Sequence, residues 1–91
     1  MQFDWDPAKA ASNERKHKVS FDEAQTIFKD PRVRELADEE HSVYEDRFRA
    51  IGKSSHGQIL TVIYTFRGEL TRIISARVAV PRERSVYDRR S

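Results

Sequence analysis

The spacing of hydrophobic positions divides the chain into two parts. Up to residue 30 these positions are sparse and separated by polar runs, as on helices that bury one narrow face. From residue 33 onward they gather into short runs rich in Val, Ile, Leu and Phe, which are typical of strands. The pattern predicts helices first and a sheet afterwards.

Two short helices are expected in the first part. Asp6 followed by Pro7 is an N-cap with proline at the first helical position, and this helix should run over residues 7–17. A capping-box sequence that begins at Ser20 predicts a second helix over residues 21–29, ended by an Asp-Pro pair. Both helices are short, so their stability must come from packing on the sheet.

Four strands are expected in the second part, over residues 33–37, 47–52, 58–66 and 69–78. The connections KSSHG and RG have the length and glycine content of hairpin turns, so the last three strands should form an antiparallel meander. An extended edge segment should precede the helices, and a short helix or tail should follow Pro81. The order predicts an α+β fold: one small domain over residues 1–91, with N-terminal helices packed on an antiparallel sheet and a short C-terminal helix.

Composition fits a small domain with a thin core. Of 91 residues, 37% are hydrophobic and 35% are charged. The chain has no cysteine, which excludes disulfides and thiolate metal sites, and we expect a cytoplasmic protein. No apolar run is long enough for a signal peptide or a membrane span, so no membrane association is expected. The three histidines lack ligand-like spacing, so neither a metal nor another cofactor is expected.

The net charge of +2 hides an uneven distribution. Residues 67–91 carry seven arginines against three acidic residues, whereas residues 30–46 carry seven acidic residues against two arginines. A polyanion would meet the arginine-rich end and be repelled by the acidic middle, so any contact with nucleic acid should be local. Two solvated faces would give the same pattern.

Arginine recurs at every fifth position near the end of the chain, at Arg67, Arg72, Arg77 and Arg82. In a regular strand, Arg72 and Arg77 would point to opposite faces, each among apolar neighbours. Arginines in such places usually pair with a carboxylate, and this is the alternative to a functional role. Arginine, histidine, carboxylate and tyrosine side chains also suit metal-free RNA cleavage, in which a 2′-hydroxyl attacks the neighbouring phosphate. Composition permits this chemistry but does not select it.

Three stretches of the chain together resemble the BrnT toxins of bacterial type II toxin–antitoxin systems. They read FDWDPAKAASNERKHKVSFDEA, DEEHSVYEDRFRAIGKSSHGQILTVIYT and RIISARVAVPRERSVY, and they cover nearly the whole chain in the family's order. The resemblance implies a compact RelE-like fold and a ribonuclease that halts translation and growth. It also implies neutralisation by a BrnA antitoxin with a ribbon-helix-helix DNA-binding part, so the toxin would meet DNA only through the antitoxin. Whether two toxins form a dimer within the complex is left open.

The resemblance and the positions of the arginines together give a set of candidate site residues. Arg77 is expected to contact the scissile phosphate together with Arg47 or Arg72, and His41 and Tyr87 are expected to transfer protons. The residues expected to bind RNA on either side are Arg67, Arg82 and Arg84. For each, the alternative is structural: an ion pair, a solvated surface, a loop histidine bonded to backbone or a core tyrosine. Two further family-like residues are interpreted structurally first, His17 as the end of a helix and Glu83 as the partner of an arginine.

Two residues depart from the family's pattern. Where the family commonly has glycine in Lys-His-Gly-Val-Ser-Phe, this chain has Lys18, which would be strained by about 1 kcal/mol in a left-handed conformation. Where an acidic residue is expected before the Arg-Gly turn, this chain has Phe66. A mechanism that uses a carboxylate there as the base therefore cannot apply to this chain.

The alternative function is a non-catalytic module that binds nucleic acid or another protein. Such a module needs exposed aromatic side chains on which bases stack. The available aromatics on the expected strands are Phe48, Tyr64 and Phe66. They alternate with aliphatic residues, as core residues do, which favours the nuclease.

Overall fold

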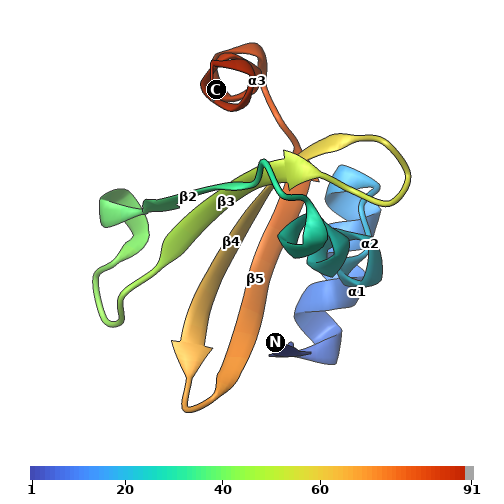
Figure 1. Cartoon of the computed structure of the whole chain (residues 1–91). Coiled ribbons are helices and arrows are strands. Elements are labelled where there is room, and N and C mark those ends of the chain that lie inside the picture. Colours follow the sequence, from blue (N-terminus) through green and yellow to red (C-terminus); the bar gives the residue numbers. More distant parts are fainter. Residues whose placement is uncertain (90–91) are drawn as a thin grey trace.

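The computed structural model describes residues 1–89, except for the side chain of His41. Its elements in chain order are β1 (Gln2–Asp4), α1 (Pro7–His17), α2 (Phe21–Gln25), the 3₁₀ helix η1 (Thr26–Lys29), β2 (Arg34–Ala37), the 3₁₀ helix η2 (Glu39–His41), β3 (Phe48–Lys53), β4 (Ile59–Arg67), β5 (Leu70–Val78) and α3 (Pro81–Asp88). The five strands form one sheet in the order β1-β5-β4-β3-β2. Figure 1 shows α1 and α2 beside this sheet and α3 beyond one of its ends. The predicted α+β class is confirmed.

The sheet is mixed, which corrects the prediction of an antiparallel sheet. β2, β3, β4 and β5 pair antiparallel, but β1 pairs with β5 in parallel, with Phe3 opposite Thr71. Hairpin turns in the sequence reveal the relative direction of strands that follow one another. No turn joins β1 to β5, so local sequence carries no signal for their direction.

Both N-terminal helices begin at the predicted caps. Asp6 accepts a hydrogen bond from the backbone N–H two residues later, at 2.8 Å, and Ser20 Oγ accepts from the Glu23 N–H at 3.0 Å. The capping box at Ser20 is only half formed, because the Glu23 carboxylate accepts a hydrogen bond from Ser54 Oγ at 2.6 Å instead. The predicted second helix is α-helical only up to Gln25 and continues as the 3₁₀ helix η1.

Lys18 ends α1 in the left-handed conformation, with φ of 60° and ψ of 29°. Its N–H donates to the Glu14 carbonyl at 2.9 Å, as in helix ends that glycine usually occupies. A side chain in this conformation costs about 1 kcal/mol relative to glycine.

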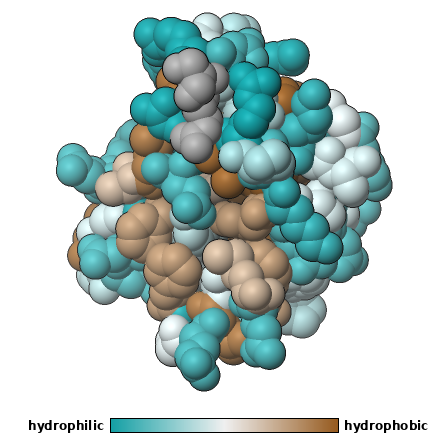
Figure 2. Space-filling view, viewed as in Figure 1, coloured by the Kyte–Doolittle hydropathy of each residue, from teal (hydrophilic) through white to brown (hydrophobic). Residues whose placement is uncertain are grey.

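The main core lies between the sheet and the two N-terminal helices. Its buried residues are Val19, Phe21, Ala24, Ile27, Ala50, Leu60, Val62, Tyr64, Ile73 and Ala76. Gly52 marks the closest approach of η1 to β3, because a Cβ there would lie 3.1 Å from the Cβ of Ile27. In the view of Figure 2, hydrophobic side chains gather in the middle of the surface below α3, surrounded by hydrophilic ones.

A smaller core lies under α3. Its buried residues are Ile51, Ile59, Ala79 and Tyr87. Ile51 and Ile59 alternate with Ala50 and Leu60 of the main core, so they point to the opposite face of the sheet. α3 therefore packs on the face that α1 and α2 leave open, and covers one end of it.

A β-bulge in β5 changes which side chains share a face. Thr61 and Thr65 are four residues apart on β4 and point to the same face. They pair with Arg77 and Arg72, which are five residues apart, because an irregularity in the register leaves Ile74 as an extra residue. Arg72 and Arg77 therefore lie on one face. The prediction that they lie on opposite faces is wrong, because it assumed an uninterrupted strand.

Candidate active site

The sheet face that carries α3 has arginines where the other face has an apolar core. Four of them come from two strands: Arg49 lies on β3, Arg47 just precedes β3, and Arg72 and Arg77 lie on β5. We call this side of the sheet the arginine face, and these four are its central arginines. Arg34 of β2, which pairs with Ile51, points to the same face. All four are half-buried, so each guanidinium group is partly sheltered from water.

Three of these arginines line one pocket of about 200 Å³. Its lining residues are Arg47, Arg49, Ile63, Ile74, Ser75 and Arg77. We call it the arginine pocket. It is smaller than the clefts of about 300–1,000 Å³ that hold drug-sized ligands, and its volume and cationic lining suit a phosphate group.

Glu83 of α3 holds the arginines of this pocket in place. Its carboxylate is buried and accepts two hydrogen bonds from Arg77, at 2.6 and 2.9 Å, which form a bidentate pair. It also accepts from Thr61 Oγ1 at 2.9 Å and from the Val80 N–H at 3.0 Å. Arg49 Nη1 lies 3.7 Å from Glu83 Oε2. The prediction that Glu83 pairs with a nearby arginine is confirmed.

These contacts keep both partners charged. Burial raises the pKa of Glu83, but hydrogen bonds from Arg77, Val80 and Thr61 outweigh burial and lower this pKa to about 2. The hydrogen bond to Glu83 raises the pKa of Arg77. A carboxylate of such low basicity is a poor proton acceptor at neutral pH, so Glu83 is a positioning residue for Arg77 and Arg49.

Arg49 belongs to the pocket although it was not among the predicted site residues. Its Nη2 lies 3.3 Å from Oδ1 of the buried Asp38, and Arg47 Nη2 lies 3.4 Å from Glu45 Oε2. Among the described residues, the Nε atoms of Arg47 and Arg49 are buried and have no hydrogen-bond partner, which costs about 1–3 kcal/mol each. The stretch RFR carried the missing signal, since alternate residues of a strand share a face.

Two predicted site arginines lie outside the pocket. Arg72 shares the arginine face, but its Nη1 donates to Asp4 Oδ2 at 2.8 Å, toward β1. Arg67 is exposed, and its Nη2 lies 3.5 Å from Glu45 Oε1. Ion pairs this exposed contribute little to stability, so Arg67 can exchange its carboxylate for a phosphate at low cost.

The remaining predicted residues belong to α3 or to the loop before β3. Arg82 and Arg84 are exposed on α3. The Tyr87 ring is buried in the smaller core under the Arg32 guanidinium, and its hydroxyl donates to Asp30 Oδ2 at 2.6 Å. Tyr87 does not line the arginine pocket. The side chain of His41 lies outside the described residues.

The strand aromatics lie on the other face of the sheet. Phe48 and Phe66 pack against Tyr64, with ring centroids 5.6 and 5.7 Å apart, and Tyr64 belongs to the main core. Because these rings point away from the arginine face, they provide no stacking surface next to the arginine pocket.

Neither a metal-ligand cluster nor a membrane-spanning helix is found within residues 1–89. Among the described side chains, which do not include that of His41, no three or more histidine, aspartate and glutamate residues gather as metal ligands. No helix in this part of the chain is long and apolar enough to cross a membrane.

Comparison with known proteins connects this architecture to one family. A family model described as the ribonuclease toxin BrnT of type II toxin–antitoxin systems matches residues 5–83. The 1.1 Å crystal structure of the ribonuclease toxin BrnT from Brucella abortus aligns with a TM-score of 0.70 and 26% identity, over 88% of this chain and 97% of that chain. A comparison with curated proteins returned no match. The matched segment contains every arginine of the pocket and also Glu83. Because the match covers most of the chain, the chain belongs to the BrnT family of ribonuclease toxins of type II toxin–antitoxin systems.

Proposed function

We propose that this toxin cleaves RNA at the arginine pocket without a metal ion, by attack of a 2′-hydroxyl on the adjacent phosphate. One observation supports this location: Arg47, Arg49 and Arg77 converge on one pocket, where Glu83 fixes two of them. Family membership supplies the reaction class, which is RNA cleavage. The pocket supplies one requirement of such an attack, namely cationic groups that stabilise the phosphoryl oxygens.

The reaction forms a bond between the 2′-oxygen and phosphorus and breaks the bond between phosphorus and the 5′-oxygen. The 2′-hydroxyl loses its proton to a base, and the leaving 5′-oxygen gains one from an acid. The products are a 2′,3′-cyclic phosphate and a 5′-hydroxyl. Charge grows on the phosphoryl oxygens in the transition state, where guanidinium N–H groups donate to them. Because Glu83 already orients Arg77, little reorganisation accompanies this step.

For the proton to the leaving group we propose His41. The loop that carries it is tied to the pocket by Ser42, whose Oγ donates to the Asp38 carbonyl at 2.7 Å and accepts from the Arg47 N–H at 2.9 Å. The hydrogen bond of Tyr87 to Asp30 supports a structural role for that tyrosine. Arg67, Arg82 and Arg84 are exposed, and we propose that they hold flanking phosphates.

The proposed partner is a BrnA-type antitoxin with a ribbon-helix-helix part, which links the complex to DNA. We propose that it covers the arginine pocket. A neighbouring pocket shares Arg47 and contains Val43 and Tyr44, whose exposed fractions are 74% and 99%. A protein that covers the arginine pocket would bury this apolar pair as well. The same proposal includes a RelE-like fold, a cytoplasmic location and dimerisation of the toxin within the complex.

RNA cleavage in excess EDTA tests the proposal. The wild type should cut a single-stranded RNA oligonucleotide and leave cyclic phosphate, and a 2′-deoxy residue at the cut site should block cleavage there. Arg77→Ala and Arg47→Ala should each reduce cleavage at least a hundredfold, which corresponds to about 2.7 kcal/mol of transition-state stabilisation. Arg15→Ala, which removes an exposed arginine from α1, serves as the matched control and should cleave normally.

The two pocket variants separate folding from chemistry. Arg77→Ala leaves the buried Glu83 without its bidentate partner and should lower stability, whereas Arg47 makes no hydrogen bond to Glu83. A loss of cleavage in Arg47→Ala at unchanged melting temperature would therefore reflect chemistry. A wild type that cuts neither free RNA nor RNA on translating ribosomes would overturn the proposal, and so would a stably folded Arg47→Ala with full activity.

A further inference from the structure

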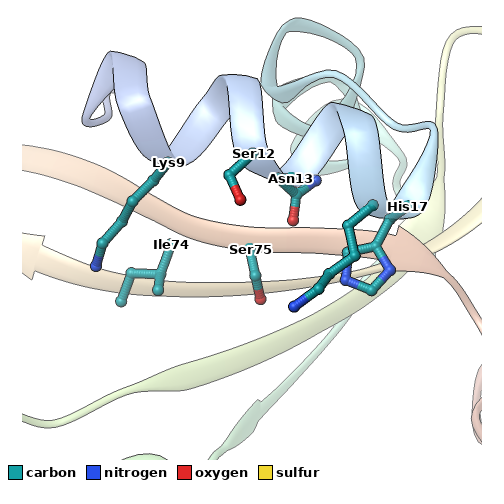
Figure 3. Close-up of a pocket in the computed structure, with 7 residues that line it drawn as sticks. Lys9, Ser12, Asn13, His17, Ile74 and Ser75 are labelled. Atoms are coloured by element: carbon teal, nitrogen blue, oxygen red, sulfur yellow. The ribbon is translucent and has the colours of Figure 1, made fainter.

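A second pocket adjoins the arginine pocket at the edge of the sheet. It measures about 190 Å³, and its lining residues are Lys9, Ser12, Asn13, Lys16, His17, Ile74 and Ser75. Figure 3 shows Lys9 and His17 extending from α1 past β5, on either side of Ser75. Ile74 and Ser75 line both pockets, so the two pockets adjoin across β5. We call the part between α1 and β5 the α1–β5 groove.

Helical spacing puts the α1 residues of the groove in one stripe. Lys9, Asn13 and Lys16 are separated by four and three residues, which places them on one side of the helix. Asn13 fixes this side against β5, because its Nδ2 donates to the Ala76 carbonyl at 2.8 Å and its Oδ1 accepts from the Ala76 N–H at 3.1 Å. The lysines beside Asn13 are therefore held along the edge of β5.

The sheet leaves this edge accessible. β1 covers β5 only up to Arg72, where its register ends opposite Asp4. Beyond that point the bulge at Ile74 interrupts the alternation of the strand, and Ile74 and Ser75 both reach the boundary between the two pockets. The bulge therefore joins the pockets, since a regular strand would turn one of these side chains into the core.

Charge favours an anion along this groove. Lys9 and Lys16 are exposed, and within residues 1–89 neither forms an ion pair with a carboxylate. The acidic segment 38–46 follows β2, which is the opposite edge strand of the sheet. A polyanion anchored in the arginine pocket is thus repelled on the β2 side and attracted on the β5 side.

We propose that the α1–β5 groove binds the sugar–phosphate backbone of the single-stranded RNA substrate next to the scissile phosphate. This rests on the proposed function, because it is the scissile phosphate in the arginine pocket that brings the strand to β5. Lys9 and Lys16 contact phosphates, and His17 and Ser75 hydrogen-bond to the backbone between them. Such contacts hold the strand in register without reading its sequence.

The test compares two double variants that remove the same charge. The groove variant, Lys9→Ala/Lys16→Ala, removes both lysines of the groove. The control variant, Lys29→Ala/Lys53→Ala, removes two exposed lysines that line a separate pocket. The probe is a fluorescent 12-nucleotide RNA with 2′-O-methyl riboses, which binds without being cut, and anisotropy is measured over a series of salt concentrations. The groove variant should bind at least tenfold more weakly at low salt. Its slope of log K against log salt should be smaller by about 1.4, since each lost phosphate contact contributes about 0.7.

Cleavage gives an independent readout. For an unmodified 12-nucleotide RNA, the groove variant should raise KM and leave kcat unchanged, because the groove binds ground state and transition state alike. A dinucleotide reaches only the arginine pocket, so its cleavage should not change. The control variant should match the wild type within about twofold in every assay, given that isolated surface charges act weakly.

The outcomes separate this inference from the proposed function. Equal weakening in the two double variants would show that only net charge matters and would overturn the groove, as would a wild type that fails to bind the probe. A wild type that binds the probe but cuts no RNA would refute the nuclease proposal, while the comparison of binding would still decide the groove.

Discussion

The two faces of the sheet differ most clearly along β4. On the side of α1 and α2, this strand presents Leu60, Val62 and Tyr64, which are buried in the main core. On the other side it presents threonines that pair with Arg77 and Arg72 of β5. One nine-residue strand thus contributes stability with one half of its side chains and frames the arginine pocket with the other half.

The difference has an energetic basis. Each fully buried aliphatic side chain of the main core contributes about 1.5–3 kcal/mol. A buried ion pair such as Arg77 with Glu83 gains much less, because desolvation offsets most of the attraction. In a domain of 91 residues the arginine face must therefore be held by the apolar face, and its carboxylates must be paired so that they do not destabilise the fold.

The largest expected effect comes from two adjacent isoleucines on β5. Ile73 is 1% exposed in the main core, and Ile74, displaced by the bulge, is half-buried beside the arginine pocket. Ile73→Ala should lower the free energy of unfolding by about 3–4 kcal/mol and Ile74→Ala by about 1 kcal/mol. Urea unfolding of both variants measures the difference. Equal losses of unfolding free energy in the two variants would mean that the main core does not contribute more stability than the arginine face.

The next effect isolates Glu83 through pH. Its pKa in the folded chain is about 2, below its ordinary value of 4.5, so the unfolded chain binds the proton first as pH falls. The stability that ionised Glu83 adds over its own protonated form is complete above pH 4.5 and is lost as pH falls toward 2, by roughly 2–3 kcal/mol. Glu83→Gln should be less stable at neutral pH and should have a flatter stability curve over this interval.

Urea unfolding at a series of pH values provides that curve. Asp30 and Glu23 also have lowered pKa values: burial raises both, but hydrogen bonds from Tyr87 to Asp30 and from Ser54 to Glu23 act against it. Both groups remain in the variant, so some acid sensitivity should persist. Parallel curves for the wild type and Glu83→Gln would show that Glu83 does not couple the arginine face to stability.

The smallest expected effect is a gain on the helix side alone. Lys18 has φ of 60°, and Lys18→Gly relieves the left-handed strain, so the free energy of unfolding should rise by about 0.5–1 kcal/mol. The arginine pocket is untouched, and kcat should stay the same. Thermal unfolding and RNA cleavage on one preparation test both halves of the prediction. A stabilised variant with altered kcat would show that the two faces are coupled more tightly than their contacts imply.

Local sequence signals predicted most of the fold. The Asp6-Pro7 pair and the cap at Ser20 start helices through contacts within three residues, and the strands follow from short apolar runs. The parallel pairing of β1 with β5 was missed because it depends on residues about seventy positions apart. Asn13 was missed for the same reason, since its hydrogen bonds to Ala76 span 63 positions.

The candidate site was predicted in part. Arg77 was expected to act with Arg47 or Arg72, and of these three the structure places Arg77 and Arg47 in the arginine pocket. The bulge at Ile74 depends on the register between two strands, which alternation within one strand does not reveal. Glu83 can hold the arginines of the pocket only because α3 packs on the sheet. This packing comes from the smaller core and not from any sequence motif.

The parallel β1 also sets the order in which the molecule can assemble during synthesis. The ribosome makes β1 first, but its neighbour β5 and the partner of Asp4 follow 68 positions later. Glu83, which orients Arg77, is made later still, in α3. A fold that depends on such distant pairings forms late and cooperatively. The nascent chain therefore has no assembled arginine pocket until α3 has emerged from the ribosome, so the pocket forms only after all five strands of the sheet have been made.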